Sequence, residues 1–271
     1  GVPCAPYAVI ETPAQLAAVH ASLLPGILKT ARMGYDGKGQ VRVKTPAELA
    51  AAWDSVGQVA CVLEKMLPLQ LECSVIVARG ADGTMVHLPV QRNLHRDGIL
   101  AVTEVYEGNL PQALVDQAVN AAKSVAKGLQ YVGVLCVEFF VLQDGRLVVN
   151  EIAPRPHNSG HYSQNACDVS QFELQVRTLA GLPLAMPRQH SPAVMLNLLG
   201  DLWFSAGDDT PVSPRWSEVL ALPGAHLHLY GKIEPRRGRK MGHLTFTGAD
   251  AGQVRAIASQ VALLLGLPPV A

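Results

Sequence analysis

The sequence has 271 residues, of which 49% are apolar and 16% are charged, and its 22 basic side chains balance its 22 acidic ones. This composition excludes a disordered chain, and the balanced charge excludes a general electrostatic attraction to nucleic acid or to a membrane surface. Aromatic residues make up only 5% of the chain, too few for a base-stacking surface.

The five cysteines are spread along the chain and form no Cys-x-x-Cys pair, which excludes the common zinc and redox motifs. Cys61, Cys73 and Cys136 lie in apolar runs, where buried free thiols are ordinary. Neither a signal peptide nor an apolar run long enough to cross a bilayer is evident. We therefore expect a cytoplasmic protein with free thiols.

The first half of the chain predicts two capped helices and many strands. Thr12-Pro13 and Thr45-Pro46 each place a capping hydroxyl before a first-turn proline, which predicts helices at 13–20 and 46–55. The expected strands lie at 26–30, at 39–44 and through most of 60–106, with a hairpin turn at 79–83.

The second half mixes long hairpins with a few helices. Apolar residues on one face, Leu114, Ala118, Ala121 and Ala122, predict a helix over 111–128. The other expected elements are a hairpin of strands 132–141 and 145–152, a helix at 170–180, strands at 193–199, 226–230 and 243–247, and a helix at 249–265. Strands and helices do not alternate strictly, so the pattern favours an α+β fold over a doubly wound parallel sheet. A change in composition near Pro183 predicts a domain boundary.

A glycine-rich loop, GYDGKGQ at residues 34–40, follows the strand that carries Lys29. It matches neither the P-loop pattern nor the dinucleotide fingerprint. Such a loop between two strands could close over a phosphate chain, with backbone N–H groups and Lys29 facing the anion. A plain hairpin loop explains the glycines equally well, so both interpretations stay open at this point.

Glu138 and Glu151 lie in the two strands of the expected hairpin. Strand periodicity places Cys136, Glu138 and Phe140 on one face, and Glu151 can occupy the matching face of the neighbouring strand. Two such carboxylates repel unless a cation bridges them, and Mg²⁺ takes one or two carboxylates together with substrate phosphate oxygens. The alternative is that each carboxylate pairs with a buried Arg or Lys.

Two polar segments follow these strands. Residues 150–161, NEIAPRPHNSGH, supply donors that could hold a small anion and orient a reacting group, or they form only a turn with a structural His161. Residues 232–240, KIEPRRGRK, hold five basic side chains. They fit a phosphate-binding loop better than a nucleic-acid patch, and a solvated charge run is the alternative.

Taken in order, these motifs resemble the ATP-grasp enzymes, most closely the N5-carboxyaminoimidazole ribonucleotide synthetases. The segments that carry the resemblance are Lys29 with GYDGKGQ, EKML at 64–67, Glu72, RNLHRDGIL at 92–100, NEIAPRPHNSGH and the late HLHLYGK and GRKMGHL. The resemblance implies an ATP-grasp fold with a lid subdomain at 1–66, a core subdomain with a metal site at 67–185 and a β-rich C-terminal domain at 186–271. It also implies a ligase of purine biosynthesis, which carboxylates 5-aminoimidazole ribonucleotide with bicarbonate and ATP through carboxyphosphate.

The resemblance also implies residue roles. The residues expected to contact ATP are Lys29, Gly34, Tyr35, Asp36, Gly37, Lys38, Gly39, Gln40, Glu64, Lys65, Met66, Leu67, Glu72, His95, Asn150 and Glu151. Those expected to bind Mg²⁺, or Mn²⁺ in its place, are Glu138 and Glu151. Those expected to face bicarbonate and the aminoimidazole nucleotide are Arg155, His157, Asn158 and, at the nucleotide phosphate, Lys232 and Arg239, with Asp36 reaching over from the loop.

Two departures from the wider pattern qualify these roles. Ala153 stands where many ATP-grasp enzymes have an asparagine, an exception typical of the narrower family that leaves two protein carboxylates for the metal. The family ordinarily begins with a further nucleotide-fold domain, which the rest of a longer polypeptide would supply, and we expect a homodimer at full length. A catalytically incompetent ATP-binding fragment and another ATP-grasp carboxylase or ligase remain alternatives.

Overall fold

The computed structural model describes residues 1–32, 34, 39–205 and 210–270. The chain divides into two compact units, which are described separately. Unit 1 comprises Gly1–Gln70, Arg96–Ile99 and Phe140–Asn150, and unit 2 comprises Leu71–His95, Leu100–Phe139 and Glu151–Ala271. The three-domain division expected from the sequence stays a prediction.

Unit 1 is built on an antiparallel sheet with the order β1-β4-β2-β3 among the described residues. Its elements are β1 (Tyr7–Ile10), α1 (Pro13–Ala17), η1 (Ala21–Leu23), β2 (Gly26–Thr30), β3 (Gln40–Val43), α2 (Pro46–Ser55) and β4 (Cys61–Lys65). One face of the sheet buries Leu28 and Leu63 against Leu49 and Trp53 of α2. Lys29 and Glu64, which alternate with these residues, therefore lie on the other face.

Unit 2 contains most of a sheet that has, in the described part of the chain, the strand order β10-β9-β5-β7-β8-β11-β13-β12, with β6 paired to β5. The strands are β5 (Leu69–Arg79), β6 (Met85–His87), β7 (Gln91–Arg96), β8 (Ile99–Val105), β9 (Gly133–Leu142), β10 (Leu147–Ala153), β11 (Ala193–Leu199), β12 (Ala225–Leu229) and β13 (Lys240–Thr247). The strand pairs β5–β6, β5–β7, β8–β11, β11–β13 and β12–β13 are antiparallel, and the expected α+β architecture with antiparallel hairpins is confirmed.

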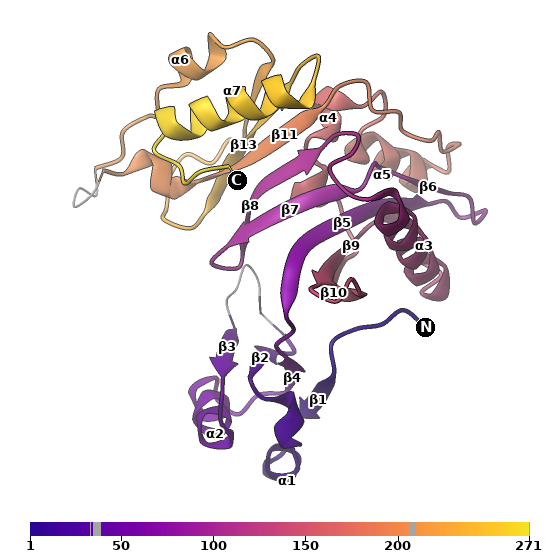
Figure 1. The fold of residues 1–271 in the computed structure, drawn as a ribbon, viewed down its shortest axis with the longest axis vertical. Helices are drawn as coiled ribbons and strands as arrows, with labels where there is room; N and C mark the ends of the chain where they lie inside the picture. Colours follow the sequence, from indigo (N-terminus) through magenta and orange to yellow (C-terminus); the bar gives the residue numbers. More distant parts are fainter. Residues whose placement is uncertain (33, 35–38, 206–209, 271) are drawn as a thin grey trace. The chain divides into compact units, whose positions relative to one another are not determined.

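Helices cover this sheet and form part of the connections between its strands. They are α3 (Gln112–Gly128), η2 (Asn158–Gly160), α4 (Ser163–Ala166), α5 (Gln171–Ala180), η3 (Gly200–Trp203), α6 (Trp216–Leu220) and α7 (Ala251–Leu264). Figure 1 shows α7 running across β11 and β13, where Val254 and Val261 pack on Leu196 and Phe246. Leu174 of α5 belongs to a second core cluster with Ile76 and Cys136 of the sheet.

Several predicted elements differ in their bounds. Strand β1 was not expected, and α1 ends at Ala17 rather than at residue 20, although Thr12 does form a full capping box with Gln15. Strand β13 begins at Lys240 instead of residue 243. On α3 the buried side chains are Ala118, Val119, Ala122 and Ala126, so Leu114 and Ala121 are only at the edge of the packed face.

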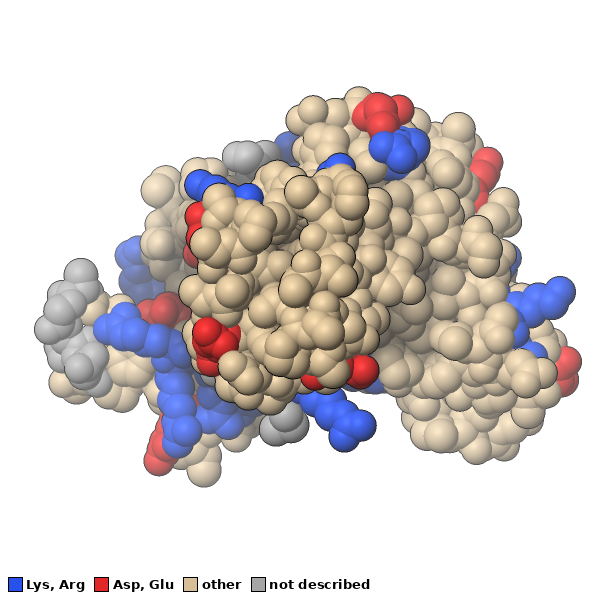
Figure 2. Space-filling model, turned by 90° about the horizontal axis from the view of Figure 1, so that it is seen from below, with Lys and Arg blue, Asp and Glu red and all other residues tan. Residues whose placement is uncertain are grey.

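The surface reflects the balanced composition. Figure 2 shows Lys and Arg side chains near Asp and Glu side chains at several places on one face, with most of that face neutral. Within the described ranges, no helix combines the length and apolar character that a membrane span requires.

Candidate active site

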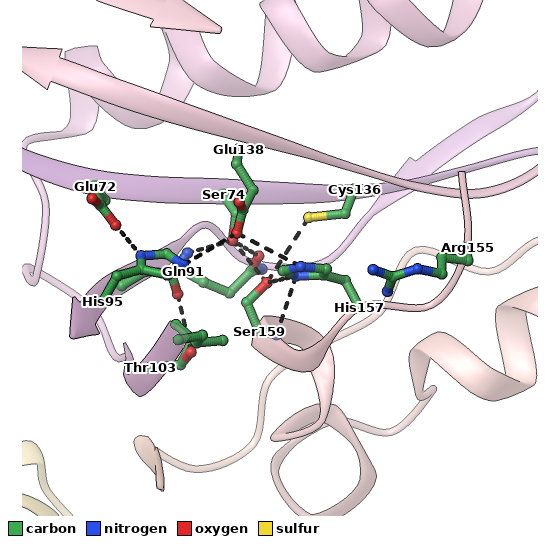
Figure 3. A network of polar contacts seen from close by, with 12 residues as sticks. Glu72, Ser74, Gln91, His95, Thr103, Cys136, Glu138, Arg155, His157 and Ser159 are labelled. Carbon is green, nitrogen blue, oxygen red and sulfur yellow. Dashed lines mark hydrogen bonds and ion pairs between the residues drawn. The ribbon is translucent and has the colours of Figure 1, made fainter. Parts of the chain in front are cut away.

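A stripe of polar side chains crosses one face of the unit 2 sheet (Figure 3). Strands β5, β7 and β9 each contribute residues two apart, and the β5–β7 register sets Glu72 opposite Asn93 and Ser74 opposite Gln91. The stripe consists of Glu72 and Ser74 on β5, Gln91, Asn93 and His95 on β7, Thr103 on β8, and Cys136 and Glu138 on β9. Polar residues at a spacing of two inside otherwise apolar strands are the sequence signal of this stripe, and only Glu72, His95 and Glu138 were singled out from it.

Glu138 is the buried carboxylate of the stripe. Its Oε1 atom has no hydrogen-bond partner among the described residues, and the Nε2 atoms of His95 and His157 lie 3.7 Å from it. Burial raises the pKa of Glu138, and the negative charges of Glu151 and Glu72 act in the same direction against the opposing charge of His95. The recorded ion pairs are thus with imidazoles and not with the Arg or Lys of the alternative prediction.

His95 lies between two carboxylates. Its Nδ1 atom is hydrogen-bonded to Glu72, and its Nε2 atom faces Glu138. Burial alone would lower the His95 pKa, but the hydrogen bond to Glu72 and the charges of Glu72 and Glu138 outweigh burial and raise it. The positive imidazolium is therefore favoured beside the two acids.

His157 enters the same site from the η2 segment. The side chain of Gln171 accepts a hydrogen bond from the His157 backbone N–H (2.8 Å) and donates one to the His157 carbonyl (2.8 Å). A Cβ on Gly160 would lie 2.2 Å from Ile76 Cδ1, so only glycine lets this segment approach the sheet. Burial lowers the His157 pKa to about 3, helped by the positive charge of Arg155, and the ring is neutral at pH 7.

Asn158 and Arg155 flank His157. The Nδ2 atom of Asn158 is buried and has no hydrogen-bond partner in the described part of the molecule, so it can donate to a ligand. Arg155 is exposed, donates from Nη1 to the Pro156 carbonyl (3.0 Å), and points its guanidinium toward His157 in Figure 3. Both expected anion-binding residues thus lie beside the carboxylate site.

The two expected metal ligands differ in environment. Glu138 is buried, whereas Glu151 is exposed. No group of three or more His, Cys, Asp or Glu side chains suited to a metal ion occurs among the described residues. The orphaned Glu138 oxygen and the nearby Glu151 charge nevertheless fit Mg²⁺, which binds through one or two carboxylates and fills its shell with water and phosphate oxygens.

Lys240 belongs to the 232–240 segment, but the sequence assigned it no role of its own. It is the first residue of β13, and its positive charge lowers the pKa values of His157, His161 and Glu138. It belongs to the GRKMGHL motif, but its neighbour Arg239 was chosen instead. The motif therefore indicated the right region of the chain, but it did not indicate which of its basic residues lies near the site.

Lys232 and Arg239 lie in the loop between β12 and β13. Lys232 donates to the Lys240 carbonyl (2.5 Å) and lies over the Tyr230 ring, and Arg239 donates to the Glu234 carbonyl (3.0 Å). A cavity of about 260 Å³ opens beside Lys232 and is lined by Trp203, Trp216 and other side chains. The expected phosphate contacts of the two basic residues are untested.

Unit 1 brings two of its expected site residues together. Lys29 Nζ and Glu64 Oε2 form an ion pair of 2.6 Å, with each side chain about a quarter exposed. Glu64 and Asn150 also line a cavity of about 230 Å³, together with Tyr7 and Cys4.

The remaining expected ATP contacts of unit 1 are placed only in part. The backbone N–H groups of Lys65 and Met66 donate to the carbonyls of Pro6 and Pro25, and Leu67 follows them. Gly39 adopts a left-handed φ of 74°, and Gln40 begins β3. Gly34 is described, whereas Tyr35, Asp36, Gly37 and Lys38 lie outside the described residues.

Two regions of the chain match models of known protein families. Residues 1–172 match the model of the ATP-grasp domain, and residues 193–257 match that of the phosphoribosylaminoimidazole carboxylase C-terminal domain. The N5-carboxyaminoimidazole ribonucleotide synthase of Brucella melitensis is 43% identical over 90% of this chain and 66% of its own length.

Two solved structures are also similar. An ADP complex of an N5-carboxyaminoimidazole ribonucleotide synthetase is 38% identical, with a TM-score of 0.86 over 97% of this chain and 67% of that protein. The Aspergillus clavatus enzyme in complex with ADP and 5-aminoimidazole ribonucleotide is 28% identical, with a TM-score of 0.85 over 98% of this chain and 69% of that protein. The chain spans about two thirds of the length of the curated relatives that it matches.

Proposed function

Because this chain belongs to the N5-carboxyaminoimidazole ribonucleotide synthase family of ATP-grasp proteins, we propose that it acts in the ATP-dependent carboxylation of 5-aminoimidazole ribonucleotide by bicarbonate. The carboxyl group would be activated as carboxyphosphate and transferred to the exocyclic amine, with release of ADP and phosphate. This is a step of purine biosynthesis.

The observation that carries the proposal is the Glu138 site. A buried carboxylate oxygen without a hydrogen-bond partner among the described residues, close to the charge of Glu151, is unfavourable in isolation. It is favourable once a divalent cation and anionic oxygens complete it, because phosphoryl transfer depends mainly on positioning and on charge neutralisation. Glu138 and Glu151 would hold Mg²⁺, which would neutralise the phosphate charges when it is bound.

The surrounding residues of unit 2 would bind and orient the second substrate. Arg155 and the buried Asn158 amide supply donors suited to bicarbonate or to the transferred carboxylate, and the neighbouring His157 has its Nε2 atom 3.7 Å from Glu138 Oε1. Lys240 adds a positive charge close to the same groups. Lys232 and Arg239 would bind the phosphate of the aminoimidazole nucleotide.

Unit 1 would contribute to ATP binding. The Lys29 ammonium would leave its ion pair with Glu64 and bind ATP phosphate oxygens instead. The cavity at Glu64 and Asn150 would accept part of the adenosine. The same proposal includes a requirement for Mg²⁺, assembly as a homodimer and a location in the cytoplasm.

A second candidate is an ATP-binding module without turnover, since the relatives are about half as long again as this chain. ADP release by the chain decides between the two. We expect release that requires both 5-aminoimidazole ribonucleotide and bicarbonate, and that Glu151→Gln abolishes. ATP binding without ADP release under any combination of substrates would contradict the proposed turnover. ADP release that does not require 5-aminoimidazole ribonucleotide would contradict the proposed substrate.

A further inference from the structure

The basic loop between β12 and β13, residues 230–239, is held by the segment that follows β11. The backbone N–H of Gly200 donates to the Arg239 carbonyl (2.8 Å). The Asp201 carboxylate accepts a hydrogen bond from the Gly238 N–H at its Oδ2 atom (2.7 Å), although the two residues lie 37 positions apart in the sequence. We call Gly200 and Asp201 the anchor of the basic loop.

The anchor also approaches the loop closely. A Cβ on Gly200 would lie 2.1 Å from the carbonyl oxygen of Arg236 and 2.7 Å from its backbone nitrogen, so no side chain fits there. Close by, the Arg237 guanidinium lies over the Phe204 ring, with Cζ 4.9 Å from the ring centroid. Consecutive residues of the loop are therefore packed on the segment 200–204.

The anchor acts on a tight turn at 236–239. The Arg239 N–H donates to the Arg236 carbonyl (3.0 Å), and Gly238 adopts a left-handed φ of 71° inside the turn. Both backbone groups of Arg239 are thus hydrogen-bonded, the N–H within the turn and the carbonyl to the anchor. The Asp201 contact holds the residue directly before it. The backbone from which the Arg239 side chain extends is therefore fixed without a ligand.

A fixed backbone matters for binding an anion. Arg239 Nη1 donates to the Glu234 carbonyl (3.0 Å), and Lys232 Nζ donates to the Lys240 carbonyl. A phosphate group can replace a neutral carbonyl as the acceptor, because hydrogen bonds between charged groups are stronger. Binding costs less conformational entropy when the loop is already held in place. The anchor therefore favours phosphate binding, although it lies outside the basic segment 232–240.

We propose that Gly200 and Asp201 are positioning residues, which hold the turn at 236–239 so that Arg239 meets the phosphate group of the nucleotide substrate. This inference rests on the proposed function for the identity of that nucleotide. A purely structural role would change the affinities for ATP and for the aminoimidazole nucleotide together. A positioning role changes only the affinity for the nucleotide whose phosphate the loop binds.

The contact itself is tested by the exchange rate of the Gly238 amide hydrogen, measured by NMR of the chain labelled with ¹⁵N-glycine and free of ligands. Gly238→Ala identifies the signal by its loss. Asp201→Ala removes the acceptor and should speed the exchange about tenfold, whereas Asp201→Asn keeps an acceptor oxygen and should leave it near the original rate. Equal exchange rates in the unmodified chain and in both Asp201 variants would overturn the anchor.

The positioning role is tested by calorimetric affinities for 5-aminoimidazole ribonucleotide and, separately, for ATP. Both Asp201 variants remove the same charge, so the difference between them reports the hydrogen bond alone. We expect Asp201→Ala to bind the aminoimidazole nucleotide about tenfold more weakly than Asp201→Asn, with equal ATP affinities. Gly200→Ala, whose Cβ would displace the Arg236 carbonyl, should act in the same direction. Equal affinities of the two Asp201 variants for the aminoimidazole nucleotide would overturn the inference.

Asp168→Ala is the matched control. Asp168 is exposed, like Asp201, and accepts a hydrogen bond from the distant backbone N–H of Arg188, also at 2.7 Å. Its replacement should change neither the Gly238 exchange rate nor either affinity, and a loss as large as that in Asp201→Ala would contradict a specific role. If the unmodified chain binds no aminoimidazole nucleotide, the proposed function fails and the positioning role with it, while the exchange rates still decide the contact.

Discussion

At the scale of single residues, the site places charges where the folded chain alone would not favour them. Glu138 is buried next to other acids, and its pKa is raised first by burial and then by the charge of Glu151. Such a buried charge lowers the stability of the ligand-free protein, as expected of a residue that serves to bind a ligand. The buried charge of Glu138 leads to the next two predictions.

Replacing Glu138 by Gln should stabilise the metal-free chain by about 1 kcal/mol at pH 7, because the amide removes the cost of a buried charge. The raised pKa means that the native state holds its proton to higher pH than the unfolded chain. The gain should therefore vanish below the ordinary glutamate pKa, where the carboxyl is protonated in both states. Urea unfolding at pH 4 and pH 7 measures it, with the exposed Glu107→Gln as the control.

Millimolar Mg²⁺ with ADP should raise the melting temperature of the unmodified chain but not of Glu138→Gln, since binding to the native state stabilises it. An equal rise in both proteins would place the metal elsewhere.

Replacing Glu72 by Gln should lower the pKa of His95, because burial then prevails over the remaining charge of Glu138. An NMR titration of His95 measures the shift. Glu173→Gln, an exposed change on α5, should leave it unaltered. A His95 pKa that is unchanged in Glu72→Gln would mean that the hydrogen bond to Glu72 does not control the ring.

At the scale of elements, the η2 segment packs closely against the sheet and α5. Gly160 has no space for a Cβ, which would lie 2.2 Å from Ile76 Cδ1 and 2.5 Å from Gln171 Oε1. Gln171 in turn holds the backbone of His157. The position of His157 thus depends on a close contact between η2 and the sheet.

Gly160→Ala should cost roughly 1–3 kcal/mol in unfolding free energy by overpacking, and ATP turnover should fall with it. Ile76→Val removes the Cδ1 atom and should restore part of both losses in the double variant. Gly128→Ala, where no atom lies within 4 Å, is the control and should be neutral or slightly stabilising. Unfolding curves of the four variants check the order, and a Gly160→Ala protein as stable as the original would contradict the close packing.

The elements also show what the sequence could predict. The Thr12 and Thr45 caps, the glycine-flanking strands and the hairpin of β9 and β10 follow from local patterns, because their signals lie within a few residues. Strand β1 was missed, because Tyr7–Ile10 is short and its partner β4 lies some fifty residues away. The hydrogen-bonded side chains that run from Thr103 to His157 come from four separate segments of the sequence. No local pattern encodes which of these segments meet.

At the scale of the whole molecule, the order of the motifs along the chain was the most informative signal. It indicated the family, whereas each motif alone left a structural alternative. It could not indicate that the charge of Lys240 lies near Glu138 and His157, or that Glu151 is exposed, because these depend on how β13 and β10 are placed in the fold.

A column of stacked rings predicts the acid sensitivity of the whole chain. His161 stacks on His243 at 4.6 Å and His243 on His228 at 4.5 Å, and burial lowers the pKa of His161 to about 4 and that of His243 to about 2. The unfolded chain therefore binds more protons below the ordinary histidine pKa, so stability must fall as the pH drops from about 6.5 toward these values.

Each of the two rings contributes a slope of up to about 1.4 kcal/mol per pH unit in that range. Urea midpoints between pH 7 and pH 5 should therefore decline, and His243→Leu should flatten the decline. The exposed His190→Asn should not. Equal slopes in all three proteins would mean that the column does not exclude protons.

The central claim is that this site transfers a phosphoryl group to bicarbonate before it carboxylates the amine. The most direct measurement is the ¹⁸O content of the phosphate released from ATP in the presence of ¹⁸O-bicarbonate and 5-aminoimidazole ribonucleotide. Transfer through carboxyphosphate predicts one bicarbonate oxygen in each phosphate. Phosphate that carries only unlabelled oxygen, or no phosphate at all, would contradict the account.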